Sequence, residues 1–311
     1  MSDLIQIDGT EATSENRPRR HADRPPWLRI RYRQNPELER LQGLVRDLEL
    51  NTVCQSAACP NLAECWSRGT ATFMLGGSVC TRRCGFCDVS TGRPSPLDAD
   101  EPDRVAGAIE SLGLRFAVVT AVARDDLPDG GAAHFAATIR AIRARGDCRV
   151  EVLIPDFKGS AASLATVLGA GPDVLNHNVE TVERLQRQVR PQAKYTRSLD
   201  LLAQAARLAP RIPVKTGLML GLGETSDEIR QTLADIVARG CQLLTIGQYL
   251  QPSSAHLPVE RYVTPDEFAE WERCARELGF ADVASGPLVR SSYRAEQLGA
   301  LAGESEPNAL R

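Results

Sequence analysis

The feature that most constrains this chain is a concentration of cysteine. Six of its nine cysteines lie within one window of 34 residues in a sequence of 311: Cys54, Cys59, Cys65, Cys80, Cys84 and Cys87. A uniform distribution would place about one cysteine there, so the cluster needs a chemical cause. Disulfides, a zinc site and a redox centre are the three readings that such a cluster allows.

The rest of the sequence helps to choose among these three interpretations of the cysteine cluster. The first 26 residues are polar, without the apolar stretch of a secretory signal, and no later apolar run is long enough for a membrane span, so we expect a cytoplasmic protein with no membrane partner. Thiols in that reducing compartment bind metals or do redox chemistry more often than they form disulfides, and the odd number of cysteines also argues against a disulfide framework. The formal net charge of −3 predicts no nucleic-acid partner.

Between about residues 73 and 280 short apolar runs alternate with helical apolar periodicity, which predicts an α/β fold of repeated strand–helix units. The runs are continuously apolar, as in a parallel sheet that is covered on both faces. Six units favour a partial (β/α)6 TIM-like barrel, with an open doubly wound sheet as the alternative. The expected strands are Thr72–Leu75, Phe116–Ala121, Val150–Ile154, Val174–His177, Val214–Leu220 and Leu243–Tyr249.

The helical segments carry their own signals. Apolar faces include Val105 to Leu112 and Val182 to Val189, and capping boxes at Thr225/Glu228 and Thr264/Glu267 predict two helix starts. We expect three parts: an N-terminal arm with cysteines over residues 1–65, the barrel over 66–282 and a C-terminal tail over 283–311.

The second cysteine triplet, Cys80, Cys84 and Cys87, has the spacing C-x3-C-x2-C in a glycine-rich loop after the first expected strand. A structural zinc site and a tetrathiolate iron–sulfur cluster both need a fourth ligand, and no close Cys or His supplies one. Three thiolates on a four-iron cluster would leave one iron open to another ligand. A zinc loop or buried core cysteines are the simpler alternatives.

This loop, GGSVCTRRCGFC, resembles that of the radical S-adenosylmethionine (radical SAM) enzymes. The resemblance implies that Cys80, Cys84 and Cys87 hold a 4Fe-4S cluster whose open iron binds S-adenosylmethionine, which is cleaved reductively to a 5′-deoxyadenosyl radical. It also implies a partial barrel, in agreement with the strand pattern.

The first triplet, Cys54, Cys59 and Cys65, has the spacing C-x4-C-x5-C and precedes the barrel, so it needs a centre of its own, for which a zinc knuckle is the plain alternative. From about residue 51 to 295 the chain resembles the lipoyl synthase family. The segments that carry this resemblance are NTVCQSAACPNLAECW, FMLGGSVCTRRCGFCDV, VTAVARDDLPDGG, VEVLIPDF, NHNVETVERL, KTGLMLGLGE, GQYLQPSSAHLPVERYVTP and SGPLVRSSYRA.

The resemblance implies that the first triplet holds an auxiliary 4Fe-4S cluster whose fourth ligand is a serine of the RSSYR motif, here Ser292. It implies two 4Fe-4S clusters per chain and insertion of two sulfur atoms, taken from the auxiliary cluster, at carbons 6 and 8 of a protein-bound octanoyl chain. The catalytic set is then Cys80, Cys84, Cys87 and Ser292.

Residues that contact S-adenosylmethionine are harder to choose. We expect Phe86, Thr120, Arg124 and Asn178 to bind it, although the loop after the second strand lacks the common GGE form of that site. The sequence allows His177 to be either a catalytic or a core histidine. It allows Lys215 and Glu224 to be either substrate contacts or members of an ion pair or a helix cap. The other three cysteines, Cys148, Cys241 and Cys274, are expected to be buried and not to be ligands.

The implied partners are octanoylated lipoyl carrier proteins, namely the lipoyl domains of 2-oxoacid dehydrogenases and the glycine cleavage H protein, and an electron donor such as ferredoxin or flavodoxin. Arg17, Arg19, Arg20 and Arg290 are candidates for docking the carrier. Three other functions compete: a sulfur-inserting enzyme of the biotin synthase type, a zinc-stabilised binding module and an electron carrier, which would normally fill all four cluster positions with protein ligands.

Overall fold

Seven parallel strands form the central sheet of the protein. Its structure is a computed structural model, which describes residues 24–28, 43, 48, 50–53, 61–67 and 70–298. The spatial order of the strands equals their order in the sequence, and all neighbouring pairs are parallel. The strands are β1 (Thr70–Leu75), β4 (Phe116–Ala121), β5 (Arg149–Leu153), β6 (Val174–Asn176), β7 (Val214–Leu220), β8 (Leu243–Gln248) and β9 (Asp282–Gly286).

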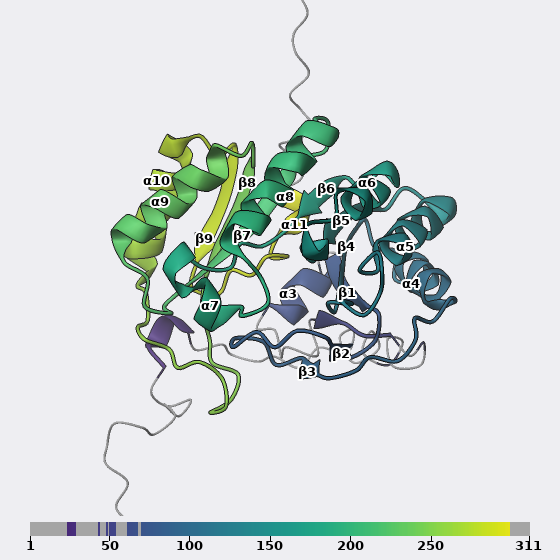
Figure 1. Cartoon of the computed structure of the whole chain (residues 1–311), viewed down its shortest axis with the longest axis horizontal. Coiled ribbons are helices and arrows are strands. Elements are labelled where there is room, and N and C mark those ends of the chain that lie inside the picture. Colours follow the sequence, from purple (N-terminus) through teal and green to yellow (C-terminus); the bar gives the residue numbers. More distant parts are fainter. Residues whose placement is uncertain are drawn as a thin grey trace, which may run out of the picture.

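Helices connect the strands and cover one face of the curved sheet (Figure 1). Among the described residues, β1 and β9 are edges that do not pair with each other, so the barrel is open. The helices are α3 (Leu62–Ser67), α4 (Glu101–Ser111), α5 (Ala132–Arg145), α6 (Ala161–Gly169), α7 (Gln186–Val189), α8 (Tyr195–Leu208), α9 (Ser226–Val237), α10 (Pro265–Leu278) and α11 (Ala295–Leu298). Short 3-10 turns are η2 (Pro26–Leu28), η3 (Phe157–Gly159) and η4 (Glu183–Leu185), and β2 (Val79–Cys80) pairs with β3 (Ser90–Thr91) beside the main sheet.

The six expected strands are all present, and the partial barrel is confirmed. The seventh strand, β9, was not predicted because its sequence, DVASG, has only one β-branched residue and no apolar run. Both predicted capping boxes are present: the hydroxyls of Thr225 and Thr264 each accept from the N–H of the glutamate three positions on, and the threonine N–H donates back to that glutamate's carboxylate.

The prediction of a single helix over Val182 to Val189 is wrong. The segment is divided into the 3-10 turn η4 and the one-turn helix α7. Glu180 before it has φ +70°, and Pro191 after it disfavours helical geometry at Arg190, so no room remains for a longer helix.

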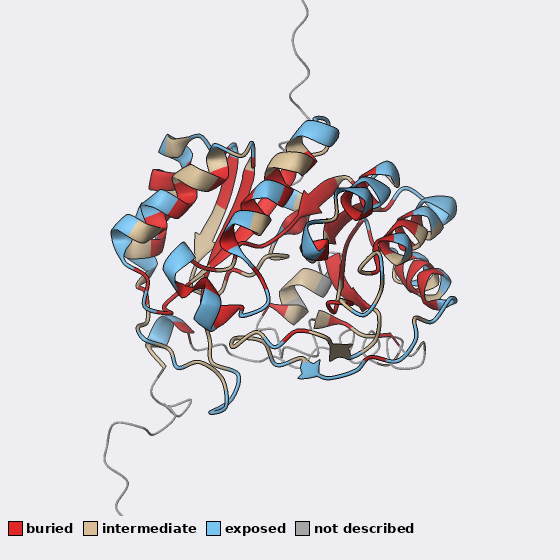
Figure 2. Ribbon diagram, in the orientation of Figure 1, coloured by how far each residue is buried: buried red, intermediate tan, exposed pale blue. Residues whose placement is uncertain are grey.

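The core lies between the sheet and the outer helices, where the strands and the inner sides of the helices consist mainly of buried residues (Figure 2). Alternate strand residues such as Phe73, Val119 and Val152 belong to this core. The opposite, concave face carries polar side chains instead, among them the fully buried ion pair of Glu151 and Lys215, with Nζ 2.9 and 3.0 Å from the two carboxylate oxygens.

The chain after β9 returns to the concave face. Ala295 of α11 packs with Phe116 and Val118 of β4, and the Thr70 hydroxyl donates to the Glu296 carboxylate at 3.1 Å. Gly247 admits this return: a Cβ there would collide with the carbonyl of Val289. The tail is therefore part of the barrel interior over the residues that the structure describes.

Over the same described residues, no helix has both the length and the apolarity required to cross a bilayer.

Candidate functional site

The loop with the second cysteine triplet follows β1 directly, at the carboxyl edge of the parallel sheet. It begins at Gly76 and Gly77, both with positive φ, and returns alongside itself through the β2–β3 pair. Loops at this edge of a parallel barrel are where active sites form. The fold thus places Cys80, Cys84 and Cys87 at the expected end of the barrel.

The first half of the loop is fixed to the segment after β4. Thr81 makes three hydrogen bonds there: its N–H and hydroxyl donate to the Ala123 carbonyl at 3.0 and 2.8 Å, and the hydroxyl accepts from the Asp125 N–H at 3.0 Å. The Cys80 Sγ accepts from the N–H groups of Arg82 and Ala123, both at 3.3 Å. Such bonds stabilise negative charge on sulfur and tune a bound cluster.

The second half is fixed to other segments. The Gly85 N–H donates to the Val189 carbonyl at 2.8 Å, its carbonyl accepts from the Leu257 N–H at 3.0 Å, and the Cys87 carbonyl lies 3.1 Å from His256 Nε2. A Cβ at Gly85 would lie 2.8 Å from the Leu257 side chain, so only glycine fits without displacement. The loop is therefore held at both halves by parts of the chain that are distant in sequence.

Burial favours the protonated form of two thiols of this loop, those of Cys84 and Cys87. It raises the pKa of Cys84 to about 12, and it raises the pKa of Cys87 as well; the charges of the three cysteines also act on one another. A bound metal centre would lower the pKa of Cys84 and Cys87 and favour their thiolates. Three thiols on eight residues fit an iron–sulfur cluster as a donor set.

Among the described residues, no three His, Cys, Asp or Glu side chains converge on a point that a single metal ion would occupy.

The four residues expected to bind S-adenosylmethionine come from three elements. Phe86 is in the cysteine loop and packs partly against the core, and the Thr120 hydroxyl donates to the Leu153 carbonyl at 2.8 Å. Arg124 is buried, with Nε and Nη2 on Asp126, while its Nη1 has no hydrogen-bond partner among the described residues. Thr120 lies in the last part of β4, and Arg124 follows three residues after the end of that strand.

Asn178 follows β6, and its Nδ2 donates to Glu180 at 3.1 Å, whereas its buried Oδ1 has no partner among the described residues. Arg190 Nη1 donates to the Asn178 carbonyl at 2.9 Å. A buried polar atom left without a partner is costly unless a ligand or water satisfies it, so Arg124 and Asn178 keep their assignment as candidate contacts.

Glu180 and Arg190 were not selected from the sequence. The charges of both act on the Cys84 thiol, Arg190 lowering and Glu180 raising its pKa, and burial raises the pKa of Glu180 itself. Glu180 could have been predicted as a site residue because it is a charged residue shortly after the strand β6. Arg190 gave no such signal because its position depends on the division of the segment into η4 and α7.

Three residues whose roles the sequence left open have hydrogen-bond or ion-pair partners within the protein. His177 is buried, with Nδ1 2.9 Å from the Ile154 carbonyl and Nε2 2.9 Å from the Ser198 hydroxyl. Lys215 pairs with Glu151, and the Glu224 carboxylate accepts from the N–H groups of Gly221 and Leu222 in a turn. The three remaining cysteines, Cys148, Cys241 and Cys274, are buried as expected.

The helix with Cys65 meets the RSSYR segment. Glu64 accepts from the Tyr293 hydroxyl at 3.3 Å and pairs with Arg294 at 3.2 Å, and Asn61 Nδ2 donates to the Leu288 carbonyl at 2.7 Å. Cys65 and Ser292 are therefore each the chain neighbour of a residue in this contact, and both are half-buried. Cys54, Cys59, Arg17, Arg19 and Arg20 lie outside the described residues.

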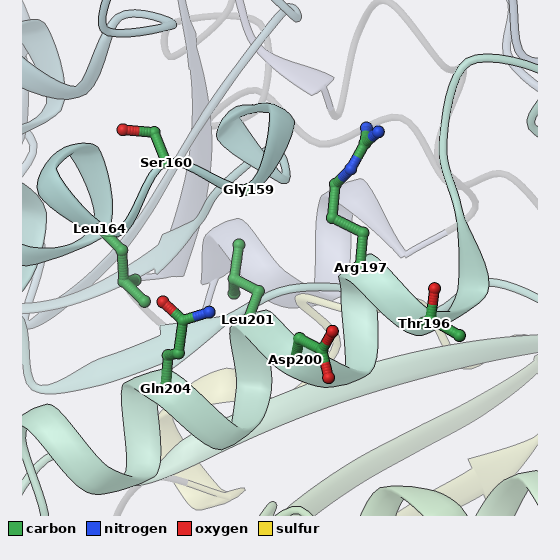
Figure 3. Close-up of a pocket in the computed structure, with 8 residues that line it drawn as sticks. All are labelled: Gly159, Ser160, Leu164, Thr196, Arg197, Asp200, Leu201 and Gln204. Atoms are coloured by element: carbon green, nitrogen blue, oxygen red, sulfur yellow. The ribbon is translucent and has the colours of Figure 1, made fainter.

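A separate surface pocket of about 170 Å³ lies between η3, the start of α6 and α8 (Figure 3). Arg197, Asp200 and Gln204 from α8 are among the residues that line it, and none of the cysteines does. Arg197 is paired with Asp156 and Asp200 with Arg239, so its charges are already compensated.

Comparisons with known proteins agree with these features. The sequence profile of the Radical SAM superfamily matches residues 74–236. Lipoyl synthase of Methylococcus capsulatus is 57% identical over 282 residues, covering 90% of this chain and 88% of that one. Lipoyl synthase of Rubrobacter xylanophilus is 55% identical over 275 residues, covering 88% and 86%.

Solved structures with low identity show the same fold. Methylornithine synthase (PylB) aligns with a TM-score of 0.53 at 13% identity, covering 87% of this chain and 77% of that chain. HydG, a maturase of the [FeFe]-hydrogenase, aligns with a TM-score of 0.54 at 15% identity, covering 81% and 56%.

Proposed function

Because this chain belongs to the lipoyl synthase family of the Radical SAM superfamily, we propose that it inserts two sulfur atoms at carbons 6 and 8 of an octanoyl chain carried on a protein lysine. Family members use S-adenosylmethionine and two 4Fe-4S clusters, and they act on lipoyl domains.

The observation that carries the finer proposal is the contact of Glu64 with Tyr293 and Arg294. A radical SAM enzyme without an auxiliary cluster has no need to bring an N-terminal cysteine helix to a C-terminal serine segment. Here the contact supports a shared site for Cys65 and Ser292, to which Cys54 and Cys59 would contribute. A zinc-stabilised module or an electron carrier would need neither this contact nor the barrel.

Cys80, Cys84 and Cys87 would hold the radical-generating cluster, and Cys54, Cys59, Cys65 and Ser292 the auxiliary one. When bound, the first cluster supplies the electron that cleaves S-adenosylmethionine, and the second supplies sulfur. The serine oxygen is a harder ligand than thiolate, so it would hold soft iron less firmly, which suits a cluster that gives up its sulfur.

The chain's own residues orient the reactants and exclude water. Arg124 Nη1 and Asn178 Oδ1, which have no partner among the described residues, offer one donor and one acceptor to S-adenosylmethionine. We assign Thr120 and Phe86 to the same binding site. The tail that lies on the concave face between β9 and β4 would close the cavity opposite the cysteine loop.

For the partners, we propose octanoylated lipoyl domains and the glycine cleavage H protein as substrates, and a ferredoxin or flavodoxin as reductant, in the cytoplasm. We also propose the division into an N-terminal arm, a barrel and a C-terminal tail, with the tail acting as the second half of the auxiliary site. The boundary expected between residues 282 and 283 divides β9, so the barrel extends to Gly286 and the tail begins after it.

The test is a single-turnover reaction of the reduced, reconstituted enzyme with S-adenosylmethionine and an octanoyl-lysine peptide, followed by mass spectrometry. The proposal expects a peptide that has gained two sulfur atoms, and deoxyadenosine in twofold excess over it. A parallel reaction with dethiobiotin is the control for biotin-type chemistry. Sulfur on dethiobiotin, or stoichiometric zinc without iron after reconstitution, would refute the proposal.

A further inference from the structure

Two adjacent arginines stand between the first two cysteines of the loop Cys80–Cys87, and the fold treats them in opposite ways. Arg82 is buried, with 7% of its surface exposed, whereas Arg83 is exposed to solvent. A buried arginine needs compensation, because the desolvation of an unpaired charge is costly. The partners of Arg82 therefore indicate what it is for.

Two carboxylates clamp the Arg82 guanidinium. Nε and Nη2 donate to the two oxygens of Asp125 at 2.7 and 2.9 Å, and Nη2 also donates to Asp156 at 2.5 Å. Asp156 is fully buried and is itself fixed by Arg197 at 3.1 Å and by the Lys158 N–H at 3.0 Å. The bidentate bond to Asp125 defines the orientation of the guanidinium plane, which a lysine could not reproduce.

The clamp holds its charges. Burial alone would lower the pKa of Arg82, but its hydrogen bonds to Asp125 and Asp156 raise that pKa above its usual range. Burial would likewise raise the pKa of Asp156, but Arg82 holds it below its usual range. Arg82 and Asp156 therefore both carry their charge at neutral pH.

The clamp connects the cysteine loop to two strand ends. Asp125 lies after β4 and Asp156 after β5, so one side chain of the loop is tied to both neighbouring strands. The backbone of Arg82 is also engaged: its N–H donates to Cys80 Sγ at 3.3 Å, and its carbonyl accepts from the Thr91 hydroxyl at 3.2 Å. A shift of residue 82 would move the sulfur of Cys80 relative to Cys84, whose side of the loop is held by Val189 and Leu257.

We propose that Arg82 is a positioning residue that sets the spacing of the three cysteine sulfurs by clamping the loop to Asp125 and Asp156. It touches neither substrate nor cofactor in this role. The inference rests on the proposed function, since it assumes that the three cysteines hold the radical-generating cluster.

The test compares Arg82→Lys with the matched control Arg83→Lys in the full-length chain after anaerobic reconstitution. Both changes keep the charge, and only the first loses a bidentate bond. The readouts are iron content, the EPR spectrum of the reduced cluster before and after S-adenosylmethionine is added, deoxyadenosine formation and the melting temperature.

We expect Arg82→Lys to melt close to the wild type, to show an altered EPR change on S-adenosylmethionine binding and to form deoxyadenosine at least about tenfold more slowly, because small misplacements at a reacting centre have large effects on rate. Arg83→Lys should stay within about twofold of the wild type, as expected for an exposed charge. An Arg82→Lys spectrum and rate equal to those of the wild type would overturn the proposal.

Should Arg82→Lys fail to fold, Asp125→Asn decides the question, because it leaves Arg82 paired with Asp156 and removes only the more exposed carboxylate. A folded Asp125→Asn with the same altered EPR change supports the clamp, and a spectrum like that of the wild type refutes it. Failure of the wild type and of Arg83→Lys to hold any cluster would instead refute the proposed function.

Discussion

The Tyr293 hydroxyl lies 3.3 Å from one oxygen of the Glu64 carboxylate and 3.4 Å from the other, although the two residues are 229 positions apart in the sequence. Glu64 precedes a cysteine of the first triplet, and Tyr293 follows the serine of the RSSYR motif. Arg294 binds the same carboxylate at 3.2 Å. One glutamate thus joins the two segments that the auxiliary cluster would need.

Glu64→Ala should loosen this junction. The pair is partly exposed, so we expect the free energy of unfolding to fall by only about 1 kcal/mol. We expect a larger effect on cluster retention, with iron per chain falling from about eight toward about four while deoxyadenosine formation continues. Glu110→Ala, which removes the exposed ion pair with Arg145, is the control; equal iron loss in both variants would contradict this role.

The two cysteine triplets should separate in their effects. Cys84→Ala should abolish deoxyadenosine formation, because the radical-generating cluster would lose a ligand. Cys65→Ala and Cys59→Ala should retain cleavage of S-adenosylmethionine without sulfur insertion. Cys148→Ala should keep both clusters, since Cys148 is a buried core residue, and iron analysis with product chromatography distinguishes the three cases. Normal product from Cys59→Ala would show that the auxiliary cluster is not the source of the inserted sulfur.

Removing one partner of the Lys215–Glu151 pair should destabilise the barrel strongly. Both side chains are fully buried, and Asn176 Nδ2 donates to Glu151 Oε1 at 2.8 Å. Lys215→Met leaves an uncompensated carboxylate, so urea unfolding should show a loss of about 3–5 kcal/mol. The double variant Lys215→Met/Glu151→Gln should lose less than Lys215→Met alone, because no buried charge then remains. A double variant that loses as much stability as Lys215→Met, or more, would mean that the loss does not come from the uncompensated charge of Glu151.

His177 gives the stability a pH dependence. Burial and the charge of Arg190 lower its pKa to about 4 from an ordinary value of 6.5. Between those values the unfolded chain binds more protons than the folded one, so the free energy of unfolding falls as the pH falls from about 6.5 to about 4, by up to about 3 kcal/mol. The difference between wild type and His177→Gln, measured by urea unfolding across this range, should shrink on acidification. A constant difference would contradict the assignment.

Local sequence signals predicted much of the fold. The apolar runs located six strands because each is covered by helices, and the Thr225 and Thr264 capping boxes located two helix starts because they involve residues only three positions apart. The strand β9 was not predicted because its small residues give no local strand signal, and its conformation depends on pairing with β8. The division between η4 and α7 was not predicted because the positive φ of Glu180 depends on tertiary contacts.

The candidate site was likewise predicted only where its signals are local in the sequence. The spacing of Cys80, Cys84 and Cys87 is local and could be read directly. The Arg82 clamp, the position of Arg190 beside Cys84 and the partner of Lys215 join residues from different strands and loops, so no sequence window contains them. Ser292 was assigned only through the resemblance, because an isolated serine carries no chemical signal of its own.

The source of the inserted sulfur is the central claim, and isotope labelling tests it most directly. The enzyme is reconstituted with iron and heavy-isotope sulfide, freed of excess sulfide, and given S-adenosylmethionine, reductant and an octanoyl-lysine peptide for one turnover. Mass spectrometry of the peptide should show two heavy sulfur atoms in wild type and none inserted in Ser292→Ala. A product with sulfur of natural isotopic abundance, or full heavy-sulfur insertion by Ser292→Ala, would contradict the account.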